Sequence, residues 1–530
     1  MIAIQKVVIY LLSNIIISIV LAHEDINFTN KSGQCKDNKE PIYILDEKSL
    51  GVIGHGSHNY ISVCPEDIPK TKIRPKRSLK QHKPKKFDHN FHDGQRHNVE
   101  YDRPDVDKIA EIIEKGNLTA YPNKNTLDSG TIFNFDEDYD IDDEIRPSSA
   151  FDIQFYCQAT PNICEKAKYS FEKATQKIAI ALKIKTQIIV QASLYSFCEV
   201  KDDNFCENNS SIGSAAASAY HILNDNGNKF LYPQPLVKQM DDIGIYLATD
   251  ITSDFNSDYS FYFSGDPVIE DGQIDFEYVV IHELIHGLGF ATAFQKYFSL
   301  VAKVIDDQDF LTPGLSLINN TYVSNWRSIQ IFDKNVVSTQ NNVSLNTYNN
   351  IIMKFSSTLG LVSPLQYHNE FIRSVGPYQA AKHVLEVASN KTGSLVFQTS
   401  NGDRINLYTK DKEFLQGTSI AHLSDEYKFS PDFIMISDVS PLQGKTLSMM
   451  YEQYGKDKNG KRHEYGAIGP NVLKILQELG WEIADPPQDL TKYYDSPKVV
   501  MVVSNAKLKY NINTNHIILI SILYILYIII

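Results

Sequence analysis

The spacing of apolar residues changes repeatedly along residues 150–300. Apolar side chains recur three and four apart over residues 171–184 (FEKATQKIAIALKI), which predicts an amphipathic helix. Residues 186–197 (TQIIVQASLYSF) and 241–251 (DDIGIYLATDI) are rich in β-branched and aromatic side chains, which predicts two strands. Residues 276–290 are strongly apolar, which predicts a buried helix. This part of the chain therefore interleaves helices with strands.

The pattern is less regular further along the chain. Residues 260–265 (SFYFSG) predict a short edge strand. Residues 291–416 are rich in asparagine and mix both patterns. Residues 471–483 (NVLKILQELGWEI) predict a helix that stops at Gly480.

Residues 23–149 are polar and irregular. They hold nine Lys and Arg between residues 70 and 86, and seven acidic residues between residues 136 and 144. Blocks of like charge are usually solvated, so we expect a propeptide or a disordered segment here. The basic block includes RPKR, a pattern typical of furin-type processing sites, and we expect cleavage after Arg77.

Both ends of the chain are apolar. Residues 1–22 place Lys6 before an apolar run, which predicts a secretory signal peptide; a membrane anchor is the alternative. Near the other end, small residues from Ser504 onward precede a polar spacer and a terminal apolar tail, the pattern of a GPI-anchor signal. We expect residues 505–530 to be removed and Ser504 to carry the lipid at the cell surface. A tail-anchored helix is the alternative.

Composition and charge agree with an exported globular protein. Of the 530 residues, 42% are hydrophobic and 22% are charged, which is ordinary for a folded chain. The net charge of -13 gives no reason to expect nucleic acid as a partner. Six cysteines and several Asn-x-Ser/Thr sequons fit a glycoprotein of the secretory pathway. The simplest local pairing joins Cys35 with Cys64, Cys157 with Cys164, and Cys198 with Cys206.

The most informative motif is HELIH, at residues 282–286. Residues four apart lie on one helix face, so His282 and His286 can bind one metal ion while Glu283 reaches a water molecule on it. Zinc proteases use this arrangement, together with a third protein ligand. A core helix with two hydrogen-bonded histidines is the alternative, but the apolar setting and the following Gly287 and Gly289 favour the metal motif.

The third ligand does not follow directly. In one large group of zinc proteases it is a histidine six residues after the second, where this chain has Thr292. Thermolysin-type enzymes take a glutamate from a following helix, but no glutamate occurs between Leu284 and Asn369. The later candidates are Asp306, Asp307, His368, Glu370, His383, Glu386, His422 and His463. A residue before the helix is the alternative.

His422 has the most informative surroundings among these candidates. Gly417, Thr418 and Ser419 precede it, and Met435 follows it in an apolar FIMI turn. A methionine beneath a three-histidine site supplies an apolar floor that positions the imidazole rings without binding the ion. An ordinary core position is the commoner role of methionine.

Four segments together resemble the leishmanolysin-like branch of the metzincin zinc proteases: HELIHGLGF, GTSIAHLS, PDFIM and IGPNVLKILQELGWEI. In that branch a long insertion separates the third histidine from the first two. The resemblance covers about residues 150–485. It implies that His282, His286 and His422 bind one Zn2+ ion, that Glu283 is the general base and that Met435 forms the Met-turn.

The resemblance also implies an α+β fold with two catalytic subdomains. Residues 150–296 would hold a twisted mixed sheet and the motif helix, with Gly289 turning the chain away after that helix. Residues 297–485 would hold the insertion, the third ligand, the Met-turn and a terminal helix. Residues 486–504 would form a linker, and the substrate would extend along an edge strand at residues 260–265.

The function implied is a secreted or surface-anchored zinc metalloendopeptidase that cleaves extracellular proteins or peptides. Some metzincins place a tyrosine after the Met-turn to stabilise the oxyanion, where this chain has Ile436 and Ser437. That departure favours the alternative function, a catalytically inactive, glycosylated surface protein for adhesion or binding. An inhibitory prodomain cysteine would require Cys35 or Cys64 to be unpaired.

Overall fold

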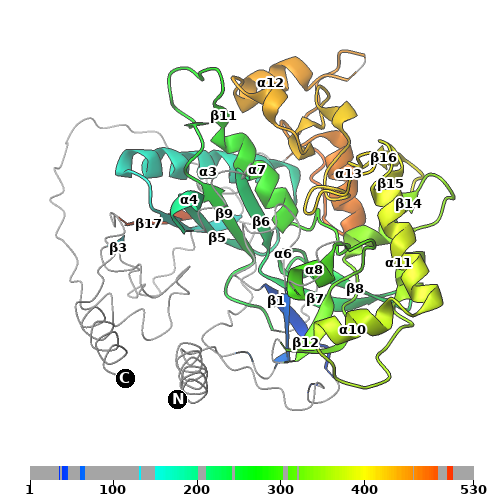
Figure 1. Ribbon diagram of the computed structural model, residues 1–530. Helices are drawn as coiled ribbons and strands as arrows, with labels where there is room; N and C mark the ends of the chain where they lie inside the picture. The colour runs from blue at the N-terminus through cyan, green and yellow to red at the C-terminus, as the bar shows by residue number, and fades with distance from the viewer. Residues whose placement is uncertain are drawn as a thin grey trace, which may run out of the picture.

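The computed structural model describes residues 35, 39–45, 60–65, 68, 130–132, 150–200, 211–240, 245–302, 308–318, 321–457, 459–487 and 498–504. Helices and strands are mixed, so the fold is α+β, as expected (Figure 1). The predicted signal peptide, Arg77 and the tail after Ser504 lie outside the described residues. Within the described part, no helix is both long and apolar enough to cross a bilayer.

The largest sheet has six strands and mixed direction. In spatial order they are β3 (Gly130–Ile132), β17 (Lys498–Ser504), β4 (Phe151–Cys157), β5 (Ile188–Tyr195), β9 (Ile251–Asn256) and β6 (Gly213–Ala217). The four inner strands are parallel, whereas β3 and β6 run antiparallel to their neighbours at the two edges. Strand β5 is buried at every position, as a strand covered on both faces should be.

Two long helices cover one face of this sheet, α3 (Pro161–Ala181) and α7 (Phe276–Gly287) (Figure 1). The side chain of Thr160 caps α3 by accepting a hydrogen bond from the amide of Ile163, and Asp275 caps α7 in the same way. These caps satisfy amide groups that have no partner inside the helix.

Three phenylalanine rings fix the two helices to the sheet. Phe171 of α3 lies 5.3 Å from Phe255 of β9 and 5.7 Å from Phe276 of α7, measured between ring centroids. Phe255 and Phe276 are themselves 5.2 Å apart. All three rings are fully buried, and each pair meets edge to face, the favoured geometry of aromatic pairs.

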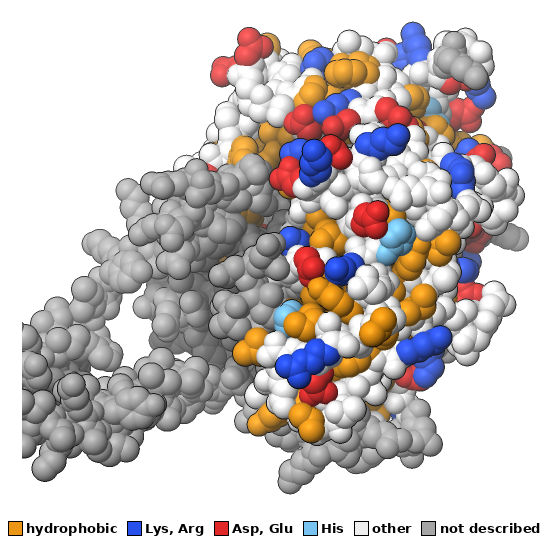
Figure 2. All heavy atoms as spheres, turned by 45° about the vertical axis from the view of Figure 1, so that its right-hand side comes forward, with side chains coloured by type: hydrophobic (Ala, Val, Ile, Leu, Met, Phe, Trp, Pro, Cys, Tyr) orange, Lys and Arg blue, Asp and Glu red, His pale blue; other side chains and the backbone are white. Residues whose placement is uncertain are grey.

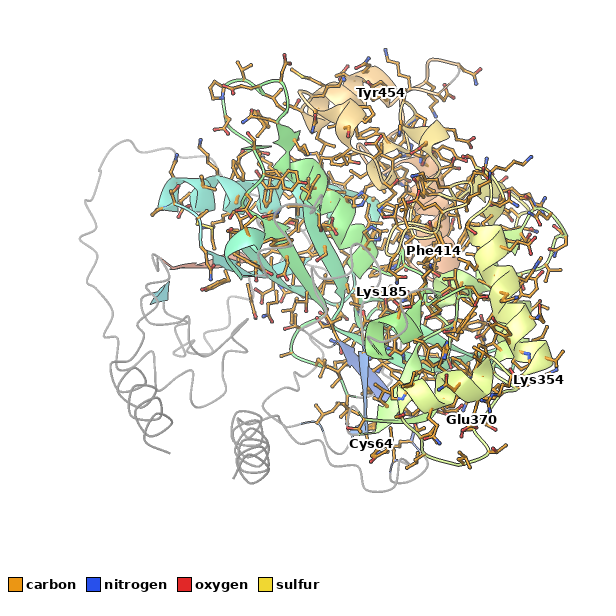
Figure 3. The ribbon with its side chains drawn as sticks, viewed as in Figure 1. Cys64, Lys185, Lys354, Glu370, Phe414 and Tyr454 are labelled. Carbon is orange, nitrogen blue, oxygen red and sulfur yellow. A yellow bond between two sulfur atoms is a disulfide. The ribbon has the colours of Figure 1, made fainter. Side chains whose placement is uncertain are left out.

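A second sheet includes part of the region that we expected to be a propeptide or disordered. Its strands, in spatial order, are β2 (Tyr60–Val63), β1 (Ile42–Leu45), β7 (Ala219–Asp225) and β8 (Asn228–Pro233), all antiparallel. A disulfide joins Cys35 to Cys64, beside these strands (Figure 3). The expectation of disorder is therefore wrong for β1 and β2. Each is only four residues long within a polar region, and β1 gains its stability by pairing with β7.

Most of the remaining elements are short, and most lie in the second half of the chain. The helices are α4 (Phe197–Val200), α6 (Gln234–Val237), α8 (Tyr297–Ala302), α9 (Leu345–Ile352), α10 (Pro364–Phe371), α11 (Val375–Ala388), α12 (Leu447–Tyr454) and α13 (Pro470–Leu479). The strands are β10 (Phe261–Tyr262), β11 (Ile274–Asp275), β12 (Leu315–Ile318), β13 (Tyr322–Trp326), β14 (Val336–Ser338), β15 (Leu395–Gln398) and β16 (Arg404–Asn406). The 3-10 turns are η5 (Ile331–Asn335), η6 (Asp425–Tyr427), η7 (Phe433–Met435) and η8 (Ser440–Leu442).

One hydrophobic core runs through both halves of the chain, from Ala150 to Trp481. Helix α13 ends at Gly480 with a φ of 116°, which confirms the predicted stop. Figure 2 brings the side of the molecule with α10 and α11 forward, where apolar side chains lie between scattered charged ones. Exposed apolar residues of this region include Leu359, Leu361 and Val375.

The strand predicted at residues 241–251 is wrong for the described residues 245–250, because β9 begins only at Ile251. The described residues 245–250 form no strand. The side-chain amide of Gln234 donates to the carbonyl oxygens of Leu247 and Thr249 and accepts from the amide of Leu247. A side chain therefore occupies backbone groups that a neighbouring strand would need.

Two further segments differ from prediction. Of residues 260–265, only Phe261–Tyr262 is a strand; it pairs with β11 in a separate two-stranded sheet, so the edge of the large sheet is β6. Residues 498–504, expected as a linker, form β17 between β3 and β4. Their sequence, KVVMVVS, is rich in β-branched residues and suits a strand.

Candidate metal centre

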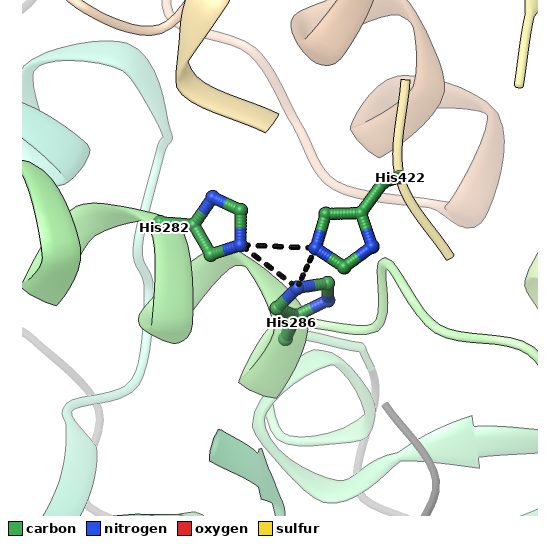
Figure 4. A group of neighbouring side chains, drawn as sticks. All are labelled: His282, His286 and His422. Atoms are coloured by element: carbon green, nitrogen blue, oxygen red, sulfur yellow. Dashed lines mark hydrogen bonds between the residues drawn. The ribbon is translucent and has the colours of Figure 1, made fainter. Parts of the chain in front are cut away.

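Three histidines meet where α7 faces the second half of the chain (Figure 4). His282 and His286 lie one turn apart on α7, and their Nε2 atoms are 3.2 Å apart. The Nε2 atom of His422 lies 3.2 Å from that of His282 and 3.3 Å from that of His286. All three side chains are buried. The structure therefore brings together the three residues predicted as ligands.

The spacing of these nitrogen atoms fits one tetrahedral zinc ion. Nitrogen ligands about 2.0–2.1 Å from tetrahedral zinc lie roughly 3.3–3.4 Å from one another. The three Nε2 separations match that triangle to about 0.1 Å. Three such ligands would leave one corner of a tetrahedron for another group.

Each ring is oriented by a backbone carbonyl at its other nitrogen. Nδ1 of His282 lies 2.7 Å from the oxygen of Ile434, and Nδ1 of His286 lies 2.7 Å from the oxygen of Phe290. Nδ1 of His422 lies 3.0 Å from the oxygen of Thr418. A carbonyl can only accept, so each Nδ1 carries the proton and each Nε2 presents a lone pair. Such outer contacts fix the tautomer that binds a metal.

The segment around His422 is held on both sides by backbone hydrogen bonds. The amide of Tyr408 donates to the carbonyl of His422 over 2.8 Å, and the amide of Ile420 donates to the carbonyl of Tyr408 over 2.9 Å. The amide of Leu423 donates to the carbonyl of Met435 over 2.8 Å. The third histidine is therefore fixed by its own neighbours as well as by the predicted Met-turn.

Met435 lies in η7 and is fully buried. The preceding residue, Ile434, provides the carbonyl that orients His282, and the hydroxyl of Tyr278 on α7 donates to the carbonyl of Phe433. Backbone oxygens of this turn therefore attach it to α7.

Gly289 lies just beyond α7 with a φ of 116°, which confirms the predicted turn. This conformation brings the carbonyl of Phe290 back to His286. A Cβ atom at residue 289 would lie 2.9 Å from Cγ of Pro233, so a side chain would be strained and crowded there. Gly289 therefore allows the chain to turn away from α7 and also allows the carbonyl of Phe290 to orient His286.

Thr292, which occupies the position of the third histidine in the compact motif, anchors the insertion instead. Its hydroxyl donates to Oδ1 of Asp333 over 2.6 Å, and the amide of Ala293 donates to Oδ2 over 2.8 Å. Burial raises the pKa of Asp333 to about 7. The carboxyl group thus ties the exit of the metal helix to η5.

Glu283 is fully buried and lines the same cleft as His282. The cleft has a volume of about 340 Å³. Gly213, at the start of edge strand β6, lies against Glu283, since a Cβ there would be 3.3 Å from Cγ of Glu283. Glu283 and the candidate ligand His282 therefore line one cleft, and the start of β6 lies against Glu283.

The other ligand candidates lie elsewhere. The ring of His368 packs against Phe298 and Phe310, and His383 pairs with Glu386 on the surface of α11. Nε2 of His463 lies beside the carbonyl of Ile468, and Glu370 accepts from Ser357. Asp306 and Asp307 lie outside the described residues.

Sequence reasoning missed two tyrosines in the cleft, Tyr259 and Tyr408. Burial raises the pKa of both phenols, so both remain protonated donors at neutral pH. Neither follows the Met-turn directly; there Ser437 lines the cleft. Their proximity to the histidines comes from folding, and no local motif indicates it.

The disulfides agree with local pairing. Cys35 pairs with Cys64 and Cys157 with Cys164, and Cys198 is also disulfide-bonded. Cys206 lies outside the described residues. Cys35 and Cys64 therefore supply no thiolate to the metal centre.

The family described as SPBPB7E8-like matches residues 140–506, which include all three histidines, Glu283 and Met435. The chain belongs to this family. The SPBPB7E8-like chain is 24% identical over 441 residues to "Uncharacterized protein PB7E8.01" of Schizosaccharomyces pombe, and the match covers 74% of each chain. No solved structure matches the chain. Neither description names an activity, so the function must be argued from the geometry of the site.

Proposed function

We propose that this protein is a zinc-dependent endopeptidase of the metzincin type, which cleaves extracellular proteins or peptides. The observation that carries the proposal is the convergence of three buried Nε2 atoms at 3.2–3.3 Å, each left with a lone pair by a carbonyl at Nδ1. Three such lone pairs repel one another unless a cation lies between them. Histidines with only a structural role would gain no stability from directing three Nε2 lone pairs toward one point.

His282, His286 and His422 would hold the ion. Zinc bound by three neutral imidazoles lowers the pKa of water at its open position and polarises a carbonyl group. Glu283, one residue from His282 and facing the same cleft, would act as general base and then transfer the proton to the leaving amine. Its burial keeps bulk water from competing for that proton.

The substrate would lie along β6. This strand is an antiparallel edge of the six-stranded sheet, and an extended peptide can pair with the backbone of such an edge. Ile212, just before β6, and His282 both line the cleft, so a peptide along the edge would pass over the metal centre. This placement replaces the one predicted at residues 260–265.

The tyrosines of the cleft offer a donor for the carbonyl oxygen of the transition state. Tyr259 and Tyr408 are protonated and line the same space as His282. The hydroxyl of Tyr278, the third tyrosine there, is already donated to Phe433. Either of the first two could replace the tyrosine that some metzincins place after the Met-turn.

We also propose that the protein acts outside the cell. The disulfides at Cys35, Cys157 and Cys198 support an oxidising compartment. A lipid anchor at Ser504 would follow directly on β17 and hold the six-stranded sheet close to the membrane. The signal peptide and the tail remain predictions of the sequence.

The proposal is tested by digestion of an unfolded protein such as casein with the purified full chain. We expect cleavage that stops when a chelator removes the metal and returns when zinc is added back. Cleavage that ignores the chelator would exclude a metal mechanism. Absence of cleavage by protein with one bound zinc per chain would favour a binding protein on this scaffold.

A further inference from the structure

Arg327 is a buried cation without an acidic partner. Its side chain is almost fully enclosed, with a relative exposure of 3%. Among the described residues, no carboxylate forms an ion pair with its guanidinium group, and its hydrogen bond through Nη1 goes to the carbonyl of Tyr60 over 3.4 Å. Buried charges are normally paired, because removing an ion from water is costly.

Three tyrosine rings surround the guanidinium group. Its Cζ atom lies 5.1 Å from the ring centre of Tyr297, 5.8 Å from that of Tyr60 and 6.0 Å from that of Tyr43. Ring faces attract a cation but carry no net charge. Burial raises the pKa of Tyr43 and Tyr60, so neither phenol supplies a negative charge at neutral pH.

The carboxylate of Asp333 lies near this region but accepts hydrogen bonds from other groups. Asp333 accepts from the hydroxyl of Thr292 and from the amides of Ala293 and Gln330. Thr292, Ala293 and Gln330 line a cavity beside Arg327, whereas Asp333 does not. Among the described residues, Asp333 forms no ion pair with Arg327. Its raised pKa, caused by burial, further reduces the negative charge that it carries near neutrality.

A small cavity adjoins the guanidinium group. Its volume is about 20 Å³, enough for one water molecule or one halide ion. Its lining includes donors as well as Arg327. Gln330 accepts from Tyr220 through Oε1 and Gln295 accepts from Gln416 through Oε1, so each keeps Nε2 as a donor. Ser328 adds a hydroxyl group to the same lining.

The backbone at Gly314 lies directly against the guanidinium group of Arg327. A Cβ atom at Gly314 would lie 1.8 Å from Nη2 of Arg327, so only glycine leaves room for the guanidinium group in this position. The amide of Arg327 donates to the carbonyl of Gly314 over 2.8 Å, which fixes the two segments together. The arginine is thus held in place at the cavity by surrounding structure.

We propose that this cavity binds a small inorganic anion, chloride under physiological conditions, which neutralises Arg327. The cavity joins three parts of the chain: Tyr60 of β2, Thr292 after α7, and Arg327 of the insertion. A bound anion would therefore stabilise the attachment of both other segments to the exit of the metal helix. The site is independent of the proposed function, because it holds none of the metal ligands.

Bromide tests the site directly, because it replaces chloride and scatters X-rays anomalously. We expect an anomalous peak beside the Arg327 guanidinium in crystals of the full chain grown in sodium bromide. We also expect the melting temperature to be on the order of a few degrees higher in sodium chloride than in sodium gluconate of equal ionic strength. Arg327→Met should abolish this difference, whereas Arg462→Gln, a control at a partly exposed arginine, should keep it.

The outcomes separate an anion from a water molecule. A crystal without the bromide peak would overturn the proposal, even if Arg327→Met failed to fold. So would a chloride effect that persists in Arg327→Met, since it would then arise from general salt effects.

Discussion

His282 and His422 are 140 residues apart in the sequence, yet their Nε2 atoms lie 3.2 Å apart in the buried centre of the molecule. The two residues lie on either side of the insertion in the sequence, and folding brings them together. The ring of His282 is set by Ile434 and the ring of His422 by Thr418, so both are oriented by the same late segment of the chain.

Replacing His422 should remove most of the bound zinc. Mutation of a residue that only orients a metal ligand typically lowers metal affinity about 10–100-fold. Loss of the ligand itself should lower it further. We expect His422→Ala to purify with little zinc, measured by elemental analysis. His383→Ala, which removes a histidine from the surface of α11, should keep one zinc per chain. Equal zinc in both variants would place the third ligand elsewhere.

Replacing Gly289 should weaken both stability and metal binding. Gly289 and Gly265 both have positive φ, 116° and 100°, but only Gly289 has Pro233 within contact distance of an added Cβ. Backbone strain of this kind costs about 1–3 kcal/mol. Gly265→Ala should lower the free energy of unfolding by this strain alone, because an added Cβ meets no other atom there. Gly289→Ala should lose more stability in denaturant unfolding and bind zinc less tightly, because Phe290 no longer orients His286. Equal losses would show that the close contact has no effect.

We expect Met435 to act through its volume, because its side chain is fully buried in the hydrophobic core. Replacement by leucine conserves volume and usually costs under about 1.5 kcal/mol, whereas replacement by alanine leaves a cavity that costs about 2–5 kcal/mol. We expect Met435→Leu to retain zinc and activity, and Met435→Ala to lose stability in thermal unfolding. Loss of zinc from Met435→Leu without loss of stability would indicate a direct role of the sulfur.

Cleavage after Arg77 should not release the N-terminal segment. The amide of Leu45 donates to the carbonyl of Ser218, and the hydroxyl groups of Tyr43 and Ser316 form a hydrogen bond of 2.8 Å. Both cysteines of the Cys35–Cys64 disulfide lie within the segment. After cleavage, this disulfide would therefore not link the segment to the rest of the chain.

We therefore expect the cut chain to elute as one species in gel filtration, and to separate in sodium dodecyl sulfate without reductant. Tyr43→Ala should weaken the association, because Tyr43 belongs to a core cluster that includes Ala217, Tyr220 and Leu231 of the later strands. Separate elution of the native fragments would instead support a releasable propeptide.

Helix α7 and the placing of its two histidines could be predicted from the sequence, because the information for both is local. Spacing of four residues places His282 and His286 on one face, and a left-handed residue such as Gly289 commonly follows a helix. His422 required a resemblance to known proteases, since spacing alone left several candidates. The carbonyl oxygens that orient the rings could not be predicted, because every residue carries one.

The errors have a common physical origin in pairing across the fold. Strand β6 reads GSAAA and lacks β-branched residues, yet it forms the edge of the large sheet because β9 pairs with it. The segment before β9 is β-rich, yet the side chain of Gln234 occupies its backbone groups. Local propensity decides neither case, since tertiary contacts outweigh it.

The most direct test of the central claim is the activity of Glu283→Gln at known zinc content. The substitution keeps the size of the side chain and removes the base, and general base catalysis contributes about 10²–10⁴-fold in rate. We predict that the variant binds one zinc per chain, like the wild type, and cleaves a protein substrate at least about a hundredfold more slowly. Cleavage at the wild-type rate by the zinc-loaded variant would contradict the proposed role of Glu283 and of this centre.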